Sequence, residues 1–121
     1  MLKDLLQKAG FLVEVVNNGR QAWDRLSSFK AKAETEKRPI TDFVQVLVSD
    51  IEMPAMDGHN LTKRVKEDPM LHDLPVMLFS SLITDSLRHL GEAAGADEQV
   101  SKPDLPGLAA LARNLARKFR P

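Results

Sequence analysis

Three short strand-like runs each lead into a side chain that can take part in ligand chemistry. They are residues 44–49 before the carboxylate of Asp50, residues 76–79 before the hydroxyl of Ser80, and residues 97–100 before the ammonium group of Lys102. In an open parallel sheet, ligands bind outside the carboxyl ends of the strands. If the three runs are strands of such a sheet, these groups predict one polar site on a shared rim.

The segment after Asp50 makes a special role for this carboxylate the favoured interpretation. An aspartate at the end of a strand is usually a cap or a turn former. Here it is followed over residues 51–58 by Ile-Glu-Met-Pro-Ala-Met-Asp-Gly, a polar turn with proline and glycine at fixed places. Ser80 alone would be a solvated hydroxyl and Lys102 alone a surface lysine, so the combination carries the prediction. A hydrolase triad is disfavoured because no Gly-x-Ser-x-Gly segment is present.

The elements that must position these groups alternate between strand and helix. Period-two and period-three-to-four spacing of apolar residues distinguishes them. Strands are predicted over residues 11–16, 44–50, 76–79 and 97–100, and helices over 2–9, 22–29, 59–67, 84–94 and 105–119. Gly10 is expected to cap the first helix in a left-handed conformation and Thr84 to cap the fourth. Trp23 with Leu26 and Phe29 is interpreted as a core stripe, and the charged residues 30–42 as a helix extension that passes into a surface loop. Repeated strand-helix units indicate a parallel sheet with helices on both faces.

The bulk composition limits the classes of function. The 121 residues carry 17 basic and 17 acidic side chains, so no strong field favours nucleic acid or an anionic membrane as partner. The absence of cysteine excludes disulfides and thiolate chemistry, and the three scattered histidines, His59, His72 and His89, are interpreted as surface residues rather than zinc ligands. The apolar runs are too short to span a membrane. We therefore expect one soluble cytoplasmic domain over residues 1–121.

Together, the motifs resemble the receiver domain of two-component response regulators. They are Val48-Ser49-Asp50, residues 53–58, residues 75–81, Gly95-Ala96-Asp97 and Lys102-Pro103. The resemblance covers nearly the whole chain and implies an α/β flavodoxin-like (receiver) fold, a doubly wound parallel sheet with strand order 2-1-3-4-5. Within the family, the segment around Asp50, the insertion before it and residues 102–106 are most similar to the receiver half of the chemotaxis coupling protein CheV.

The resemblance also implies a role for each site residue. Asp50 matches the phosphoacceptor that takes a phosphoryl group from a histidine kinase, and Lys102 matches the lysine that offsets charge on the transferring oxygens. Ser80 matches the hydroxyl residue that hydrogen-bonds the phosphoryl group. Asp50 and the backbone carbonyl of Glu52 match ligands of a divalent ion, expected to be Mg²⁺. Pro103 would follow a cis peptide, and the domain is expected to signal rather than to act as an enzyme.

Two departures from the family pattern affect this interpretation. Gln99 stands where family members have an aromatic switch residue, so any coupled side-chain switch must differ. Receivers also begin with a strand that ends in an acidic pair of metal ligands, and this chain starts at the following helix, where Asp4 cannot substitute. We therefore expect the fold to lack its N-terminal first strand and its acidic pair. The chain would then be a truncated domain, whose uncovered strand edges would favour a homodimer or a strand-exchanged assembly.

Two functions follow as hypotheses. The first is a phosphoacceptor receiver that modulates chemotaxis signalling through an attached or separate coupling domain. The second is a pseudo-receiver, a protein-interaction module of the same fold that is not phosphorylated. The missing acidic pair favours the second, and a longer natural chain that supplied it would favour the first.

Overall fold

A three-stranded parallel sheet forms the centre of the molecule in the computed structural model, which describes residues 2–52, 56–80, 83–101 and 105–117. The strands are β1 (Leu47–Asp50), β2 (Val76–Ser80) and β3 (Glu98–Ser101), and their order in the sheet is β1-β2-β3. Each neighbouring pair is parallel. The α/β class and the parallel sheet predicted from the alternation of elements are confirmed.

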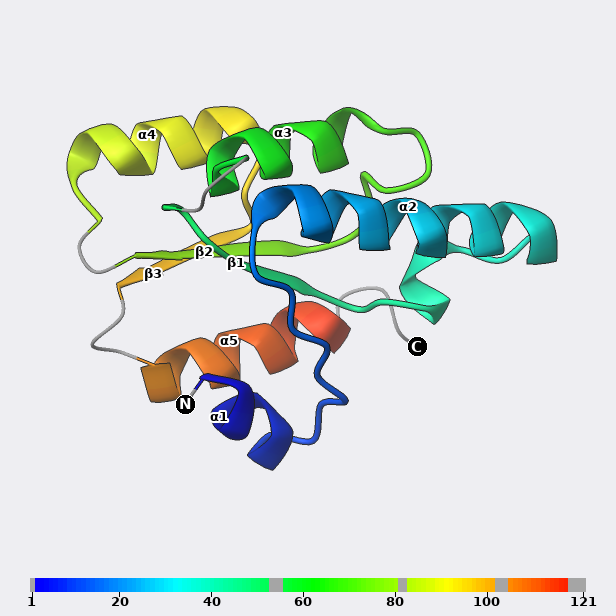
Figure 1. The fold of residues 1–121 in the computed structure, drawn as a ribbon. Helices are drawn as coiled ribbons and strands as arrows, with labels where there is room; N and C mark the ends of the chain where they lie inside the picture. The colour runs from blue at the N-terminus through cyan, green and yellow to red at the C-terminus, as the bar shows by residue number, and fades with distance from the viewer. Residues whose placement is uncertain (1, 53–55, 81–82, 102–104, 118–121) are drawn as a thin grey trace.

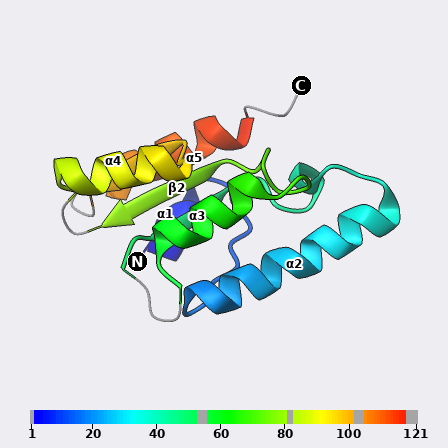
Figure 2. The ribbon, with the colours of Figure 1, turned by 90° about the horizontal axis from the view of Figure 1, so that it is seen from above.

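Helices cover both faces of the sheet, as Figure 1 shows. The helices are α1 (Leu2–Lys8), α2 (Gly19–Glu36), the short 3-10 helix η1 (Ile40–Asp42), α3 (Gly58–Glu67), α4 (Asp85–Ala94) and α5 (Leu105–Arg117). In Figure 1, α2, α3 and α4 lie above the sheet, and α1 and α5 lie below it. Seen from above, α3 lies between α4 and α2 (Figure 2). The sheet is therefore the middle of three layers.

The helix ends agree with the capping residues. The side chains of Asn18, Asp57 and Thr84 accept hydrogen bonds from backbone N–H groups in the first turns of α2, α3 and α4. Such caps satisfy N–H groups that have no partner within the helix. Gly10 and Gly95 have φ of 100° and 96°, in the left-handed region where glycine ends helices without strain. The predicted caps at Gly10 and Thr84 are confirmed.

Each face of the sheet has its own apolar cluster. The upper cluster joins the sheet to α2 and α3 and consists of Ala22, Leu26, Ala33, Ile40, Ile51, Leu61, Val65, Leu71, Leu74, Val76 and Leu78. The lower cluster joins it to α1 and α5 and consists of Leu6, Met77, Val100, Leu108, Ala109 and Ala112. Trp23 and Phe29 pack against the upper cluster. The predicted stripe on this helix is therefore a core stripe.

The prediction of a strand over residues 11–16 was wrong. The segment begins with strand-like alternation, with Phe11 and Val13 half-buried and Leu12 and Glu14 exposed, but it belongs to no ladder. A strand is defined by hydrogen bonds to a neighbour. None of the backbone hydrogen bonds between described residues involves residues 12–16. The local sequence has the pattern of a strand, and the tertiary structure supplies no described partner for it.

Other boundaries differ by a few residues. Strand β1 begins at Leu47 rather than at residue 44, because residues 40–42 form η1 and the chain joins the ladder only after it. Most of residues 30–42 is helical, since α2 continues to Glu36 and ends at Lys37 in the left-handed conformation. No helix in the described ranges is both long and apolar enough to cross a membrane.

An ion pair joins α2 to the end of α3. Lys30 Nζ lies 2.8 Å from Asp68 Oδ2, and Asp68 Oδ1 accepts from the backbone N–H groups of Met70 and Leu71. Partial burial opposes ionisation of Asp68, but these hydrogen bonds outweigh it and hold the pKa of Asp68 below its ordinary value of 3.8. The hydrogen bond to Asp68 likewise raises the pKa of Lys30. The charged pair therefore stabilises the folded state.

We expect acid to weaken this ion pair. A carboxyl whose pKa is lowered by folding contributes stability above its unfolded pKa, and this contribution disappears as the pH falls through the lower folded pKa. When the pH is lowered from about 6 to about 3, the wild type should therefore lose more free energy of unfolding than Lys30→Met does, by about 1 kcal/mol. Urea denaturation followed by circular dichroism at both pH values measures the difference. Lys63→Met, which removes an exposed lysine, is the control, and equal acid losses in both variants would contradict the prediction.

Candidate functional site

Asp50 and Ser80 lie at the carboxyl ends of neighbouring strands. Asp50 is the last residue of β1 and pairs with Phe79, so Ser80 is one residue further along β2. Ser80 is 1% exposed, whereas Asp50 is half-buried. On the other side of β2, Ser80 pairs with Ser101, the last residue of β3. The structure thus places a carboxylate and a hydroxyl on adjacent strand ends. Ser81, Lys102 and Pro103, with its preceding peptide bond, lie outside the described residues.

The turn after Asp50 is organised around its carboxylate and carbonyl groups. The backbone N–H of Glu52 donates to Asp50 Oδ1 at 3.1 Å, and Ser49 Oγ donates to the carbonyl of Asp50 at 2.9 Å. Asp50 also takes part in at least one further interaction. A carboxylate that accepts hydrogen bonds keeps a defined orientation. The β1 end therefore presents Asp50 in a fixed geometry.

Asp57 and Gly58, at the end of this turn, cap α3 and allow it to approach β1 closely. Asp57 Oδ1 accepts from the N–H of Asn60 at 2.8 Å and caps α3. A Cβ atom on Gly58 would lie 2.5 Å from the carbonyl oxygen of Asp50 and 3.0 Å from Leu78 Cδ2. Only glycine allows the start of α3 to approach β1 this closely. Asp57 and Gly58 thus position the site from outside it.

Gln99 attaches β3 to α4. Its Nε2 donates to the carbonyl oxygen of Arg88 at 3.0 Å, and a Cβ atom on Gly91 would lie 2.3 Å from Gln99 Oε1. Gly91 is the only residue of α4 that is fully buried. An amide at position 99 therefore occupies a notch that glycine leaves in the helix. Gln99, which stands where family members have an aromatic residue, thus makes a polar contact with α4.

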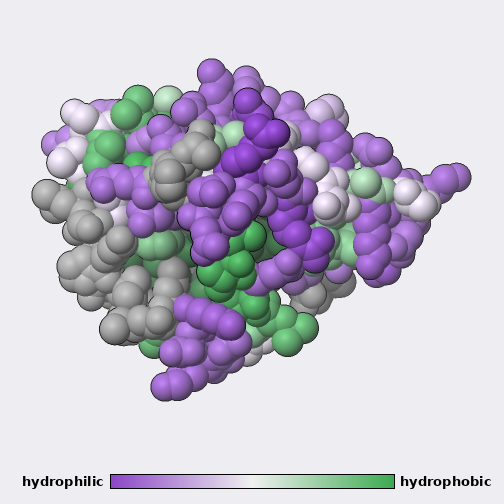
Figure 3. All heavy atoms as spheres, viewed as in Figure 1, coloured by the Kyte–Doolittle hydropathy of each residue, from purple (hydrophilic) through white to green (hydrophobic). Residues whose placement is uncertain are grey.

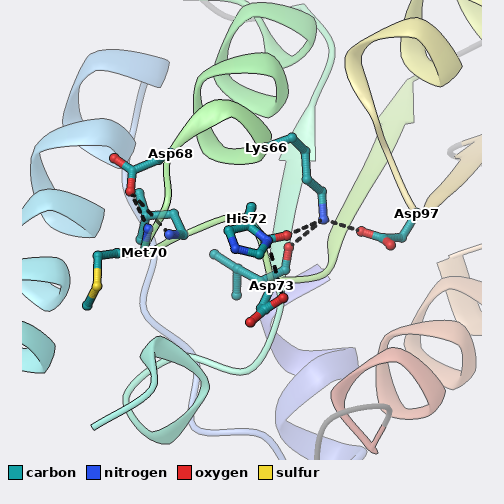
Figure 4. A network of polar contacts seen from close by, with 8 residues as sticks. Lys66, Asp68, Met70, His72, Asp73 and Asp97 are labelled. Atoms are coloured by element: carbon teal, nitrogen blue, oxygen red, sulfur yellow. Dashed lines mark hydrogen bonds and ion pairs between the residues drawn. The ribbon is translucent and has the colours of Figure 1, made fainter. Parts of the chain in front are cut away.

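Sequence reasoning missed a brace at the opposite end of β2. Lys66 Nζ donates to the carbonyl of Leu74 at 2.8 Å and to that of His72 at 3.3 Å, and it lies 2.9 Å from Asp97 Oδ2 (Figure 4). The same Asp97 oxygen accepts from the N–H of Val76 at 2.8 Å. The brace thus ties the end of α3 to the starts of β2 and β3. Only the spacing of Gly95-Ala96-Asp97 before a strand hinted at a role for this aspartate.

The three histidines differ in exposure. His72 and His89 are exposed as predicted, but His59 is half-buried and its Nε2 atom is buried without a hydrogen-bond partner. His59, in the first turn of α3, is thus less exposed than the surface position predicted for it. No sequence pattern around His59 distinguishes it from the exposed histidines.

The described residues do not bring together an acidic set of the kind that Mg²⁺ would need. Within residues 2–52, 56–80, 83–101 and 105–117, no group of three or more His, Cys, Asp or Glu side chains is arranged to hold a metal ion. Mg²⁺ prefers six oxygen ligands, commonly one or two carboxylates with water and phosphate oxygens. Asp50 offers one carboxylate, and Glu52 was expected to contribute only its backbone carbonyl. Any metal bound here would depend mainly on water and on the phosphoryl ligand.

A family comparison decides what kind of domain this is. The family model for the response regulator receiver domain matches residues 1–113. The chain belongs to the response regulator receiver family. It is therefore a receiver domain of two-component signalling.

Curated relatives support the same assignment. This receiver is 34% identical over 120 residues to the response regulator GtcR of Aneurinibacillus migulanus, covering 99% of this chain and 43% of that protein. It is also 34% identical over 122 residues to a protein-glutamate methylesterase/protein-glutamine glutaminase of Archaeoglobus fulgidus, covering 97% of this chain and 30% of that protein. The chain therefore spans less than half the length of these relatives. The two relatives carry different names, and neither of these matches is specific to CheV.

A solved structure agrees with the observed fold. The receiver domain of a signal transduction histidine kinase from Syntrophus aciditrophicus superposes with a TM-score of 0.77 at 31% identity. The match covers 98% of this chain and 81% of that one. The arrangement of sheet and helices described above is thus the receiver fold.

Proposed function

We propose that this receiver domain accepts a phosphoryl group on Asp50. The observation that carries the proposal is the position of Asp50 at the carboxyl end of β1, next to the end of β2 at Ser80. The turn that holds Asp50 also has the sequence pattern of the family. In the proposed reaction, a carboxylate oxygen of Asp50 forms a bond to phosphorus as the bond from phosphorus to a histidine nitrogen of the kinase breaks.

The neighbouring groups have complementary roles in this proposal. Phosphoryl transfer depends mainly on positioning and on charge stabilisation. Lys102 offsets the charge on the transferred oxygens, and the Ser80 hydroxyl donates a hydrogen bond to one of them. Receiver domains generally bind Mg²⁺ at this rim, and the ion, when bound, neutralises phosphoryl charge. Here Asp50 and the Glu52 carbonyl would hold it together with water.

The signalling context is also a proposal. Residues 1–121 form one receiver domain of a larger signalling system in the cytoplasm, with a histidine kinase as the phosphoryl donor. The resemblance to CheV supports a role in chemotaxis, where phosphorylation would change how a coupling domain engages its partners. Phosphorylation adds about −1.5 to −2 charge near neutral pH, so it biases the equilibrium between two conformations of the loops at the rim.

A pseudo-receiver is the second candidate function. The lack of an acidic ligand set favours it, because no group of three or more His, Cys, Asp or Glu side chains in the described residues is arranged to hold a metal ion. In that case the same surface binds a partner protein without any chemistry at Asp50. Both candidates share the fold and differ in whether Asp50 is modified.

A phosphorylation assay separates the two candidates. The purified chain is mixed with Mg²⁺ and acetyl phosphate, and intact mass is measured over a short time course because aspartyl phosphate is labile. We expect the wild type to gain one phosphoryl group and Asp50→Ala to gain none. Asp57→Asn is a matched control, since asparagine can still cap α3 and Asp50 is intact, so it should gain the group. A folded wild-type sample that gains no mass would support the pseudo-receiver.

A further inference from the structure

The first residue of α2 lies directly against the turn that follows Asp50. Gly19 is buried, and a Cβ atom at this position would overlap the carbonyl oxygen of Met56 and lie 2.7 Å from Met56 Cβ. Rotation of a side chain cannot relieve such an overlap, because the oxygen belongs to the backbone. Only a residue without a Cβ atom therefore lets α2 begin in contact with this turn.

The start of α2 is itself fixed, so it cannot simply move away from the turn. The Asn18 side chain caps the helix, and Ala22 and Leu26 are buried in the upper cluster. Trp23 packs against the same cluster, and the guanidinium carbon of Arg64 on α3 lies 5.6 Å from its ring centroid. Figure 3 shows mostly hydrophilic side chains on the outward side of this helix. Displacement of α2 would uncover its apolar side.

The turn on the other side of the contact holds the carboxylate of Asp50. The N–H of Gly58 donates to the carbonyl of Ile51 at 2.9 Å and closes the turn at its base. Within the turn, the N–H of Glu52 donates to Asp50 Oδ1 at 3.1 Å. Met56 belongs to the same closed turn. A contact at Met56 therefore acts on the backbone that orients Asp50.

We propose that Gly19 is a positioning residue for Asp50. The start of α2 holds the turn over residues 51–58 in place, as Gly58 does from α3, and thereby keeps the Glu52 N–H directed at the Asp50 carboxylate. The role of Gly19 in phosphoryl transfer rests on the proposed function, because displacement of a reacting group by about 1 Å can slow a reaction by about 10²-fold. Its role in holding the turn does not.

The backbone of Gly19 shows that its contact with Met56, and not its conformation, requires glycine. Among the described glycines, only Gly10 and Gly95 have positive φ, so an alanine could adopt the backbone conformation at position 19. The capping side chain belongs to Asn18. Alanine is also the better helix former, so helix propensity alone predicts that Gly19→Ala leaves the turn unchanged and strengthens α2. The proposal predicts the opposite result for the turn.

NMR of the whole 121-residue chain, without any phosphodonor, tests whether Gly19 holds the turn. In Gly19→Ala, we expect the Glu52 amide resonance to shift and the Gly58 amide to exchange about tenfold faster relative to the buried Leu78 amide of β2. Ala33→Gly is the matched control, since it weakens the other end of the same helix. It should change neither quantity. A folded Gly19→Ala chain with both quantities unchanged, or the same changes in Ala33→Gly, would overturn the proposal.

Asn18→Ala keeps the test decisive if Gly19→Ala does not fold. It removes the cap without adding an atom, so the first turn of α2 frays and its contact with Met56 loosens. We expect the Glu52 amide to shift in this variant as well. An unchanged Glu52 amide would overturn the proposal.

The rate of phosphorylation by acetyl phosphate tests the consequence for the reaction. In Gly19→Ala, the maximum rate should fall by about tenfold or more, while the acetyl phosphate concentration for half-maximum rate should change less than about twofold. This division is expected because the turn orients Asp50 rather than binding the donor. Ala33→Gly should keep both values, and an equal loss of rate in the two variants would overturn the positioning role. A wild-type chain that gains no phosphoryl group refutes the proposed function, and the NMR comparison then decides the role of Gly19.

Discussion

Replacing Gly58 by alanine should lower the free energy of unfolding by about 3 kcal/mol, because overpacking against backbone cannot be relieved by a side-chain rotation. The added Cβ would lie 2.5 Å from the carbonyl oxygen of Asp50 and 3.0 Å from Ile51 Cα. Relief of this clash requires α3 to move away from β1, which also displaces the backbone that orients Asp50. Urea denaturation measures the stability, and the acetyl phosphate assay measures the effect on the site.

Asn60→Ala is the control for this substitution. Asn60 lies in the same turn of α3, and it is exposed. Its replacement should change stability by less than about 0.5 kcal/mol, as is usual for surface positions. A Gly58→Ala variant as stable as Asn60→Ala would show that the close approach to Asp50 does not constrain the turn.

The second large effect is expected at the opposite end of the sheet, for Lys66→Met. The side chains of Lys66 and Asp97 are only 20% and 18% exposed, so removal of the ammonium group takes one charged partner from a largely buried carboxylate. The carbonyls of His72 and Leu74 also lose a donor. Together these losses should cost about 2 to 3 kcal/mol of unfolding free energy. Thermal and urea denaturation measure the loss.

Lys63→Met separates this brace from a general effect of lysine removal. Lys63 is on the same helix and exposed, so its replacement should be nearly neutral. A double-mutant cycle with Asp97→Asn should give a coupling energy of at least about 1 kcal/mol, because the two residues share one contact. Equal destabilisation by Lys66→Met and Lys63→Met would show that the contacts of Lys66 do not stabilise the fold.

Gly58 and Lys66 together show how α3 is held at both ends. Its first turn is packed against the carbonyl of Asp50, and its last turn is tied to the starts of β2 and β3. Under the proposed function, phosphorylation of Asp50 would act on the first of these contacts.

Much of the fold was predictable because it depends on local patterns. Apolar spacing identified the helices and the three strands of the sheet, and the caps at Gly10 and Thr84 follow from backbone requirements at helix ends. The motif around Asp50 is contiguous in sequence, so its position at the end of a strand could be read directly. These features require only interactions between residues a few positions apart.

The remaining features depend on residues that are distant in sequence. Lys66 and Asp97 are 31 positions apart, and neither has a local pattern that identifies its partner. The notch at Gly91 has meaning only because Gln99 lies against it, and the partial burial of His59 depends on the elements packed around α3.

The 11–16 segment shows most clearly what the sequence alone determined and what the tertiary structure decided. Alternating apolar residues determined that the segment is extended, with Phe11 and Val13 directed toward the lower cluster. The absence of a described neighbour within hydrogen-bonding distance decided that it is not a strand. Side-chain alternation is a property of one segment, whereas a ladder is a property of two, so only the packed molecule specifies whether an extended segment becomes part of a sheet.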